Sequence, residues 1–312
     1  MNLEGIHHIT AITADGPRNV DFYARVLGLR LAKKTVNQDD PTAYHLFFTD
    51  EQGSPGSDLT FFEYPGARRG RPGAGMVQRV VYRVAGEAAL DFWADRLGGE
   101  GVEVAREPGA LRFADPEGLG LELRVAETPD EPLVARSLEV PEEHALQGFH
   151  AVQAAVADPG PSERVLSDVL GFSELRDHDW EARGEARGGS IELAGGRGPG
   201  LGGAGTVHHV AWATRMDEQA AWRDRVIAAG LQPTPVIDRF YFRSVYFREP
   251  GGVLFELATM GPGFTADEPL EHLGERLSLP PAYEPLRGQL EKILTPLPDT
   301  RRWRPAPVKS SY

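Results

Sequence analysis

An internal repeat constrains the fold of this 312-residue chain more than any other feature. Residues 5–29 and 148–172 follow one pattern, in which an apolar segment containing histidine leads into a helix-like segment that ends at glycine. Matching residues lie 143 positions apart, as Gly28 and Gly171 do. Each half also contains a weaker second copy, which opens near residue 77 or 207 and closes on an apolar segment. The sequence therefore predicts a duplicated domain built from four similar units.

Each unit is predicted to hold one strand, one helix and about three further strands. In the first unit, Val20, Tyr23 and Leu27 recur at the spacing of one helix face. In the last unit, residues 253–257 alternate, so that Glu256 lies opposite its apolar neighbours. The expected fold class is α+β, with four βαβββ modules arranged in two tandem domains.

The modules should form an N-terminal pair at 1–125 and a C-terminal pair at 148–262, separated by a linker at 126–147 that contains three prolines. A tail at 263–312, rich in proline, is expected to wrap the body and to form a short helix near 286–294. The glycine-rich segment 183–205 is predicted to hold a mobile loop within the second domain.

Composition narrows the possible partners and the possible metal ligands. The net charge of -13 argues against nucleic acid or an anionic membrane as a partner. No apolar run approaches the roughly 20 residues of a membrane span, and the N-terminus has no features of a signal peptide. The absence of cysteine indicates a cytoplasmic protein. Any metal must be held by nitrogen and oxygen, which leaves Fe(II), Mn(II), Ni(II) and Zn(II) as candidates.

Two His-His pairs and one glutamate occupy matching points of the repeat. The pairs lie in residues 5–10 (GIHHIT) and 206–211 (TVHHVA), and Glu256 lies on the closing segment of the fourth unit. The repeat places His8 on the opening strand of unit one and places His209 with Glu256 in unit four. A site between these two units would unite two imidazoles and one carboxylate, which is the ligand set of a mononuclear non-haem iron centre.

The other two units serve as a comparison. The counterparts of His8, His209 and Glu256 are Ala151, Arg79 and Glu122, and these cannot form a cation site because arginine repels a cation. Arg79 and Glu122 are expected to pair with each other instead. Glu63 closes unit one where Glu256 closes unit four. It is either a fourth ligand or a carboxylate that is solvated or supports the ligands from behind.

These features resemble the vicinal oxygen chelate superfamily, which includes glyoxalase I, bleomycin-resistance proteins and extradiol ring-cleaving dioxygenases. Within that superfamily the chain is most similar to the ring-cleaving dioxygenases that act on hydroquinones. The matching stretches are 5–10 (GIHHIT), 19–23 (NVDFY), 27–31 (LGLRL), 33–37 (KKTVN), 39–41 (DDP), 44–46 (YHL), 53–56 (GSPG), 59–62 (LTFF), 207–211 (VHHVA), Arg239 and 244–250 (SVYFREP). The likeness extends from residue 5 to the Leu-Pro-Pro of the tail.

The resemblance implies roles for eight residues. His8, His209 and Glu256 match the Fe(II) ligands of the family. The other matches are Tyr246 and Arg239, which contact substrate, His208 and Thr10, which support the site from behind, and His7, a histidine of the same motif. Strand alternation points His208 away from His209, so a shared pocket requires a twist or a bulge in that strand.

The implied reaction is extradiol-type ring cleavage, in which Fe(II) and O2 act on a hydroquinone- or catechol-type aromatic diol. Mn, Zn or Ni can replace iron in the purified protein, and a homo-oligomer is expected. Two alternatives remain open from the sequence. One is a glyoxalase-type isomerase or lyase that uses Ni or Zn, which Glu63 as a fourth ligand would favour. The other is a binding or resistance protein with no catalysis, which the complete set of three ligands disfavours.

Overall fold

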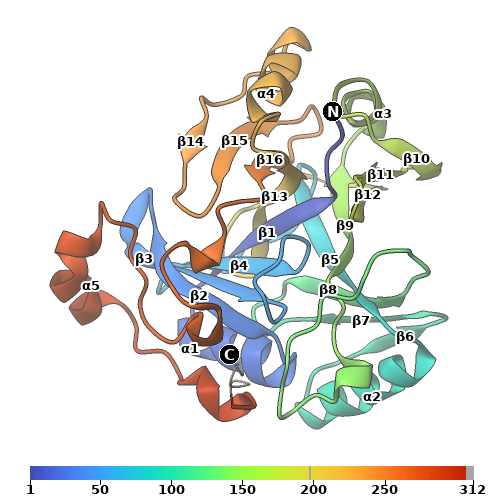
Figure 1. The fold of residues 1–312 in the computed structure, drawn as a ribbon. Helices are drawn as coiled ribbons and strands as arrows, with labels where there is room; N and C mark the ends of the chain where they lie inside the picture. The colour runs from blue at the N-terminus through green and yellow to red at the C-terminus, as the bar shows by residue number, and fades with distance from the viewer. Residues whose placement is uncertain (197, 307–312) are drawn as a thin grey trace.

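The computed structural model describes residues 1–196 and 198–306, which form two curled eight-stranded sheets with few helices (Figure 1). The predicted α+β class with four βαβββ modules is confirmed. Module one consists of β1 (Ile6–Thr13), α1 (Gly16–Val20), η1 (Asp21–Val26), β2 (Arg30–Asn37), β3 (Asp40–Thr49) and β4 (Asp58–Glu63). Module two consists of β5 (Met76–Val84), α2 (Glu87–Gly99), β6 (Ala105–Glu107), β7 (Ala110–Ala114) and β8 (Gly120–Val125).

The second half repeats this order. Module three consists of β9 (Phe149–Val156), α3 (Pro159–Arg164), η3 (Val165–Val169), β10 (Ser173–Arg176), β11 (Asp179–Arg183) and β12 (Gly188–Gly195). Module four consists of β13 (Thr206–Thr214), α4 (Gln219–Ala228), β14 (Ile237–Asp238), β15 (Arg243–Arg248) and β16 (Leu254–Thr259). The duplication extends to helix geometry, because α1 and α3 both continue as a π-helical turn, η1 and η3.

Each sheet combines one module from each half of the chain. The first sheet has the strand order β14-β15-β16-β13-β1-β4-β3-β2, and the second has the order β10-β11-β12-β9-β5-β8-β7-β6. Modules one and four therefore meet where β1 pairs antiparallel with β13, and modules two and three meet where β5 pairs with β9. This pairing brings the two His-His pairs onto adjacent strands.

Local sequence explains the helix that opens module one. The side chain of Asp15 accepts a hydrogen bond from the backbone N–H of Arg18 and so caps the first turn of α1, where Pro17 stands. The chain leaves the helix at Gly28, whose φ of 71° lies in the left-handed region that favours glycine. Apolar side chains of this helix, such as those of Val20 and Tyr23, are fully buried in the core.

The glycine-rich segment 183–205, which is expected to hold a mobile loop, also contains the strand β12. This strand is paired on both sides, with β11 and with β9, so its backbone hydrogen bonds offset the low strand propensity of glycine. Glycine is needed there for close packing, since a Cβ at Gly189 would lie only 2.8 Å from the backbone nitrogen of Ile6. Residue 197 lies outside the described residues.

In the part of the chain that the structure describes, the segments outside the modules contain several short helices. They are η2 (Glu142–His144) between the halves, and η4 (Phe264–Ala266), η5 (Leu270–His272), η6 (Glu284–Leu286), α5 (Arg287–Ile293) and η7 (Thr300–Trp303) in the tail. The tail runs along module one, where Leu277 bridges to Lys34 and α5 lies against β3 (Figure 1). Among the described residues, no helix combines the length and the apolar character that crossing a membrane requires.

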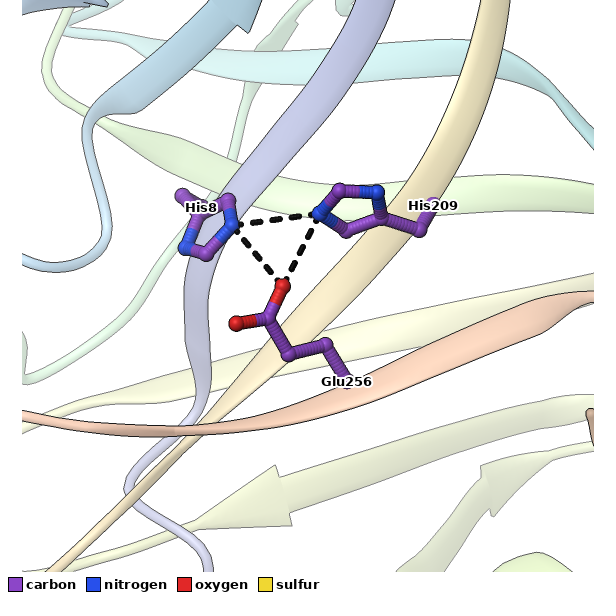
Figure 2. A group of neighbouring side chains, drawn as sticks. All are labelled: His8, His209 and Glu256. Atoms are coloured by element: carbon purple, nitrogen blue, oxygen red, sulfur yellow. Dashed lines mark hydrogen bonds and ion pairs between the residues drawn. The ribbon is translucent and has the colours of Figure 1, made fainter. Parts of the chain in front are cut away.

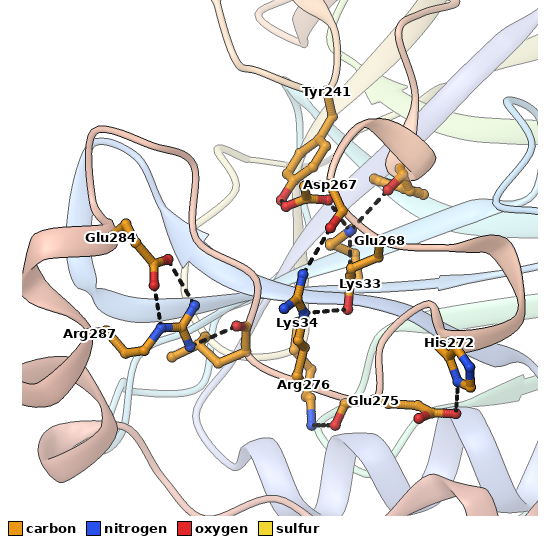
Figure 3. Close-up of polar contacts among 12 residues, drawn as sticks. Lys33, Lys34, Tyr241, Asp267, Glu268, His272, Glu275, Arg276, Glu284 and Arg287 are labelled. Carbon is orange, nitrogen blue, oxygen red and sulfur yellow. Dashed lines mark hydrogen bonds and ion pairs between the residues drawn. The ribbon is translucent and has the colours of Figure 1, made fainter.

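A buried lysine of β2 holds the start of the tail. The amino group of Lys33 lies 2.7 Å from a carboxylate oxygen of Asp267, contacts Glu268 and donates to the carbonyl of Phe264 at 3.1 Å (Figure 3). Lys33 is fully buried. The hydroxyl of Tyr241, from the loop between β14 and β15, donates to Asp267. The tail and this loop are therefore tied to one another.

Candidate metal centre and pocket

Three strands of the first sheet bring His8, His209 and Glu256 together. The residues come from β1, β13 and β16, and β13 lies between the other two strands. Register explains the meeting, because Thr10 lies opposite His209 across β1 and β13, and Ala211 lies beside Glu256 across β13 and β16. All three functional side chains are buried.

The atoms that could hold a metal converge on one point (Figure 2). Oε2 of Glu256 lies 3.1 Å from Nε2 of His8 and 2.9 Å from Nε2 of His209. The two Nε2 atoms lie 3.3 Å apart. The part of the chain that the structure describes contains one such group of His, Cys, Asp and Glu side chains, and its ligand atoms all lie within 4.8 Å of one another.

β-Bulges place both histidines of each pair at this site. The pairing of β1 with β13 contains two register shifts. One lies between Ile6 and His8, and the other lies between Thr10 and Ala11. The first shift passes over His7, and the second passes over His208 on the partner strand. A bulge re-aims side chains and suspends strict alternation. His7 and His208 therefore stay in contact with the histidines that follow them.

The first histidine of each pair fixes the proton position on the second. Nε2 of His7 lies 3.1 Å from the carbonyl oxygen of Thr259 and must carry a proton, because a carbonyl only accepts. Burial, and then the neighbouring His8, lowers the pKa of His7 to about 3, so its Nδ1 is an acceptor. Nδ1 of His8, 2.9 Å away, must then be the donor. This leaves the Nε2 lone pair of His8 directed at the metal position.

His208 and His209 repeat this arrangement. Their Nδ1 atoms lie 2.8 Å apart, and a proton on Nδ1 of His209 leaves its Nε2 free to coordinate. Burial lowers the pKa of His209, which keeps the ring neutral. His208 itself is exposed and lines a neighbouring cavity next to Arg248. It does not line the pocket that contains Tyr246 but contacts His209 behind the metal position, so its supporting role stays a prediction.

We expect His7→Phe to weaken metal binding by about 10- to 100-fold, because the support of a ligand's second nitrogen commonly contributes that much. The measurement is the dissociation constant for Fe(II) or Zn(II), obtained by anaerobic competition with a chromophoric chelator. His150→Phe is the matched control, since His150 occupies the same bulge in the β5–β9 pairing, where no ligand group exists. Unchanged affinity in the His7 variant would contradict the assigned orienting role.

Glu256 carries the negative charge of the group. Burial disfavours the charged form, but His8 and His209 outweigh it and hold the pKa of this carboxyl well below its usual range. Both carboxylate oxygens are buried and have no partner in hydrogen-bond geometry among the described residues. A carboxylate and two imidazole lone pairs that converge without a donor between them fit a bound cation.

A pocket opens over this group and collects two further predicted residues. Tyr246 stands on β15 with its ring centre 5.6 Å from that of His209, and Arg239 lies with its guanidinium carbon 5.6 Å from the Tyr246 ring. Arg239 also donates two hydrogen bonds to Asp39, at 3.0 and 2.8 Å. Asp39 lies in the turn between β2 and β3, and sequence reasoning did not single it out because its partner is 200 residues away. Burial, and then the nearby Glu256, raises the pKa of Tyr246, so its hydroxyl stays protonated.

The pairing of β1 with β4 places three other residues, Thr10, Thr60 and Glu63. Thr10 is buried behind the pocket, where its hydroxyl accepts a hydrogen bond from Thr60 at 2.9 Å. Glu63 lies beside Thr13 at the far end of β4, where its carboxylate accepts the backbone N–H of Gly16 at 3.0 Å. The position that matches Glu256 in register is Thr60, because Thr60 lies beside Thr10 as Glu256 lies beside Ala211. The option of Glu63 as a fourth ligand is therefore wrong.

The second sheet holds no counterpart of the metal group. Glu122 contacts three arginines there, with Arg112 at 2.8 Å, Arg79 at 3.5 Å and Arg124 at 2.7 Å. The predicted pairing of Arg79 with Glu122 is confirmed. Both sheets keep the bulges, so the difference between them lies in side chains and not in the backbone.

Fold and site together define a protein of paired βαβββ modules with one His-His-Glu group that can hold a metal. The family model of the Glyoxalase/Bleomycin resistance protein/Dioxygenase superfamily matches residues 5–123 and 148–257. The chain belongs to this superfamily.

Within the superfamily, several proteins similar to this chain are named as ring-cleaving dioxygenases. MhqA of Bacillus subtilis strain 168, named provisionally as a ring-cleaving dioxygenase, is 38% identical over 95% of this chain and 100% of its own length. The chlorohydroquinone/hydroquinone 1,2-dioxygenase of Sphingobium indicum is 34% identical over 94% of this chain and 96% of its own length. A crystal structure of a Bacillus subtilis protein, named provisionally as a dioxygenase, covers 95% of this chain and 98% of its own, with 39% identity and a TM-score of 0.87.

Proposed function

We propose that this protein is an Fe(II)-dependent dioxygenase that cleaves the ring of a hydroquinone- or catechol-type diol. His8, His209 and Glu256 would hold the iron. The observation that carries the proposal is the convergence of three buried acceptor atoms beneath a pocket that also presents Tyr246 and Arg239. Two histidines and one carboxylate on one side of a metal leave open positions, as non-haem iron oxygenases require.

When bound, Fe(II) supplies Lewis acidity toward a substrate hydroxyl and the redox chemistry that O2 needs to react with an aromatic ring. Both atoms of O2 enter the ring-opened product, so no further reductant is needed. The protonated hydroxyl of Tyr246 is placed to donate a proton beside His209. The guanidinium of Arg239, held by Asp39, can stabilise anionic oxygen that develops on the substrate.

The glyoxalase-type alternative has less support. It was favoured by Glu63 as a second carboxylate ligand, and Glu63 instead lies at the N-terminus of α1. The group of candidate ligands among the described residues contains one carboxylate, that of Glu256.

The test is oxygen uptake by metal-stripped protein that has been reloaded anaerobically with Fe(II). We expect O2 consumption that matches substrate loss with at least one of hydroquinone, chlorohydroquinone, methylhydroquinone and catechol. Tyr246→Phe should reduce turnover by about 10²- to 10⁴-fold if its proton is used in the reaction. No uptake with any of these diols, despite one bound iron per chain, would overturn the proposal.

A further inference from the structure

A histidine that is not part of the metal group faces the same pocket from the opposite module. His45 stands on β3, and both His45 and Phe47 line the pocket together with His8 and His209. We infer that His45 binds the second hydroxyl of a 1,4-diol whose first hydroxyl is bound at the metal, and so makes the site selective for hydroquinones over catechols. This inference rests on the proposed function and names the substrate class within it.

The ring of His45 is held in place on three sides. Its Nε2 lies 2.8 Å from the hydroxyl oxygen of Thr60. Its ring centre lies 3.9 Å from that of Phe47 and 4.4 Å from that of Phe62. These contacts fix the imidazole before substrate arrives, and a group that is already ordered loses little entropy when it binds a ligand.

The hydrogen bonds behind His45 determine which of its ring nitrogens is free to form a hydrogen bond with a ligand. The hydroxyl of Thr60 donates to the hydroxyl of Thr10, so the oxygen of Thr60 accepts from Nε2–H of His45. The imidazole is neutral because phenyl rings surround it and a cation site lies nearby. Nδ1 is then an acceptor, and no described residue donates a hydrogen bond to it. A phenolic hydroxyl is a donor that suits this atom.

The residues that line the pocket come from two modules, which form two opposite walls. Tyr246 and Arg239 approach from module four, and His45 approaches from module one through β3. The hydroxyls of a 1,4-diol stand at opposite ends of the ring, so one can bind at the metal while the other reaches His45. In a 1,2-diol both hydroxyls lie on one edge, and the ring presents only carbon to Nδ1. His45 is half-buried, so a 1,2-diol that covers Nδ1 keeps water away from it, and an acceptor left without a donor costs binding free energy.

Direct binding tests this assignment without turnover. The Fe(II)-loaded protein is titrated anaerobically by calorimetry with hydroquinone, catechol and phenol. One hydrogen bond between neutral groups corresponds to roughly two- to tenfold in affinity. We expect hydroquinone to bind wild type tighter than phenol by that factor, and His45→Phe to bring the hydroquinone-to-phenol ratio close to one. The catechol-to-phenol ratio should be unchanged by this substitution.

Controls separate a binding role from a structural one. His150→Phe, the same substitution in the sheet that lacks the metal group, should keep both ratios at their wild-type values. If His45→Phe does not fold, Thr60→Val removes the group that orients His45 and should lower the hydroquinone-to-phenol ratio while the catechol-to-phenol ratio holds. A His45→Phe or Thr60→Val protein that keeps the wild-type hydroquinone-to-phenol ratio would overturn the inference.

Oxygen uptake in wild type distinguishes this inference from the proposed function. Uptake with hydroquinone, together with unaltered binding ratios in the variants, would remove the role of His45 and leave the dioxygenase proposal intact. Absence of uptake with every diol would remove the dioxygenase proposal, and the binding ratios would still decide whether His45 recognises a para hydroxyl.

Discussion

Glu256→Gln is expected to lose stable iron binding and to lower oxygen uptake by more than about 100-fold. Loss of a residue that only supports a metal ligand costs up to about 100-fold, and loss of the ligand itself should cost more. Glu256 supplies the only carboxylate of the metal group, and within the described part of the chain its oxygens have no hydrogen-bond partner that could substitute for a cation. The neutral amide keeps the shape of the side chain but removes the charge that offsets Fe(II). Iron per chain after anaerobic loading and dialysis is the direct measurement.

Glu122→Gln is the matched control for this prediction. Glu122 stands on β8 where Glu256 stands on β16, but its partners are arginines. The control variant should keep one iron per chain and wild-type turnover, whatever its effect on stability. Glu256→Gln protein that binds iron and consumes oxygen like wild type would show that the metal, if any, is held elsewhere.

Lys33→Met is expected to lower the free energy of unfolding by about 3–5 kcal/mol, which is typical when one partner of a buried charge pair is removed. Lys33 is fully buried, and its loss leaves Asp267 without this cation and leaves Glu268 with the more distant Arg276, at 3.6 Å (Figure 3). Its amino group also lies 4.9 Å from the centre of the Tyr241 ring. Urea denaturation of wild type and variant gives the difference directly.

The neighbouring residue provides the control. Lys34 donates to the carbonyl oxygen of Glu275 at 3.2 Å near the surface, so Lys34→Met should cost less than about 1 kcal/mol. The double variant of Lys33→Met with Glu268→Gln should be more stable than Lys33→Met alone, because it removes a buried carboxylate that has lost its closest partner. A Lys33→Met protein within 1 kcal/mol of wild type would contradict the anchoring role of this lysine.

Loosening the tail should also affect the pocket. Tyr241 and Phe242 line the pocket over the metal group, and the hydroxyl of Tyr241 is held by Asp267 at 2.9 Å. Lys33→Met is therefore expected to raise KM for the diol more than it changes kcat, because the ligands on β1, β13 and β16 do not depend on the tail.

The sequence by itself determined the four modules and the unequal chemistry of the two sheets. The copies of a duplicated segment keep the same spacing of glycine and apolar residues, and this spacing can be read from the sequence alone. It identified the βαβββ units and the matching positions of His8 and His209. The replacement of His209 by Arg79 in the other half was equally readable, because arginine cannot share a site with a cation.

Only the tertiary structure decided which strands join the modules and how each side chain is aimed. The bulges at His7 and His208 arise from long-range pairing of β1 with β13, which a local pattern does not encode. Register between β1 and β4 put Thr60, and not Glu63, at the position of Glu256. His45 and Lys33 look like ordinary strand residues in the sequence, and only the folded chain places His45 at the pocket and the start of the tail over Lys33. Their environments depend on contacts between segments far apart in the chain, and one sequence does not reveal those contacts.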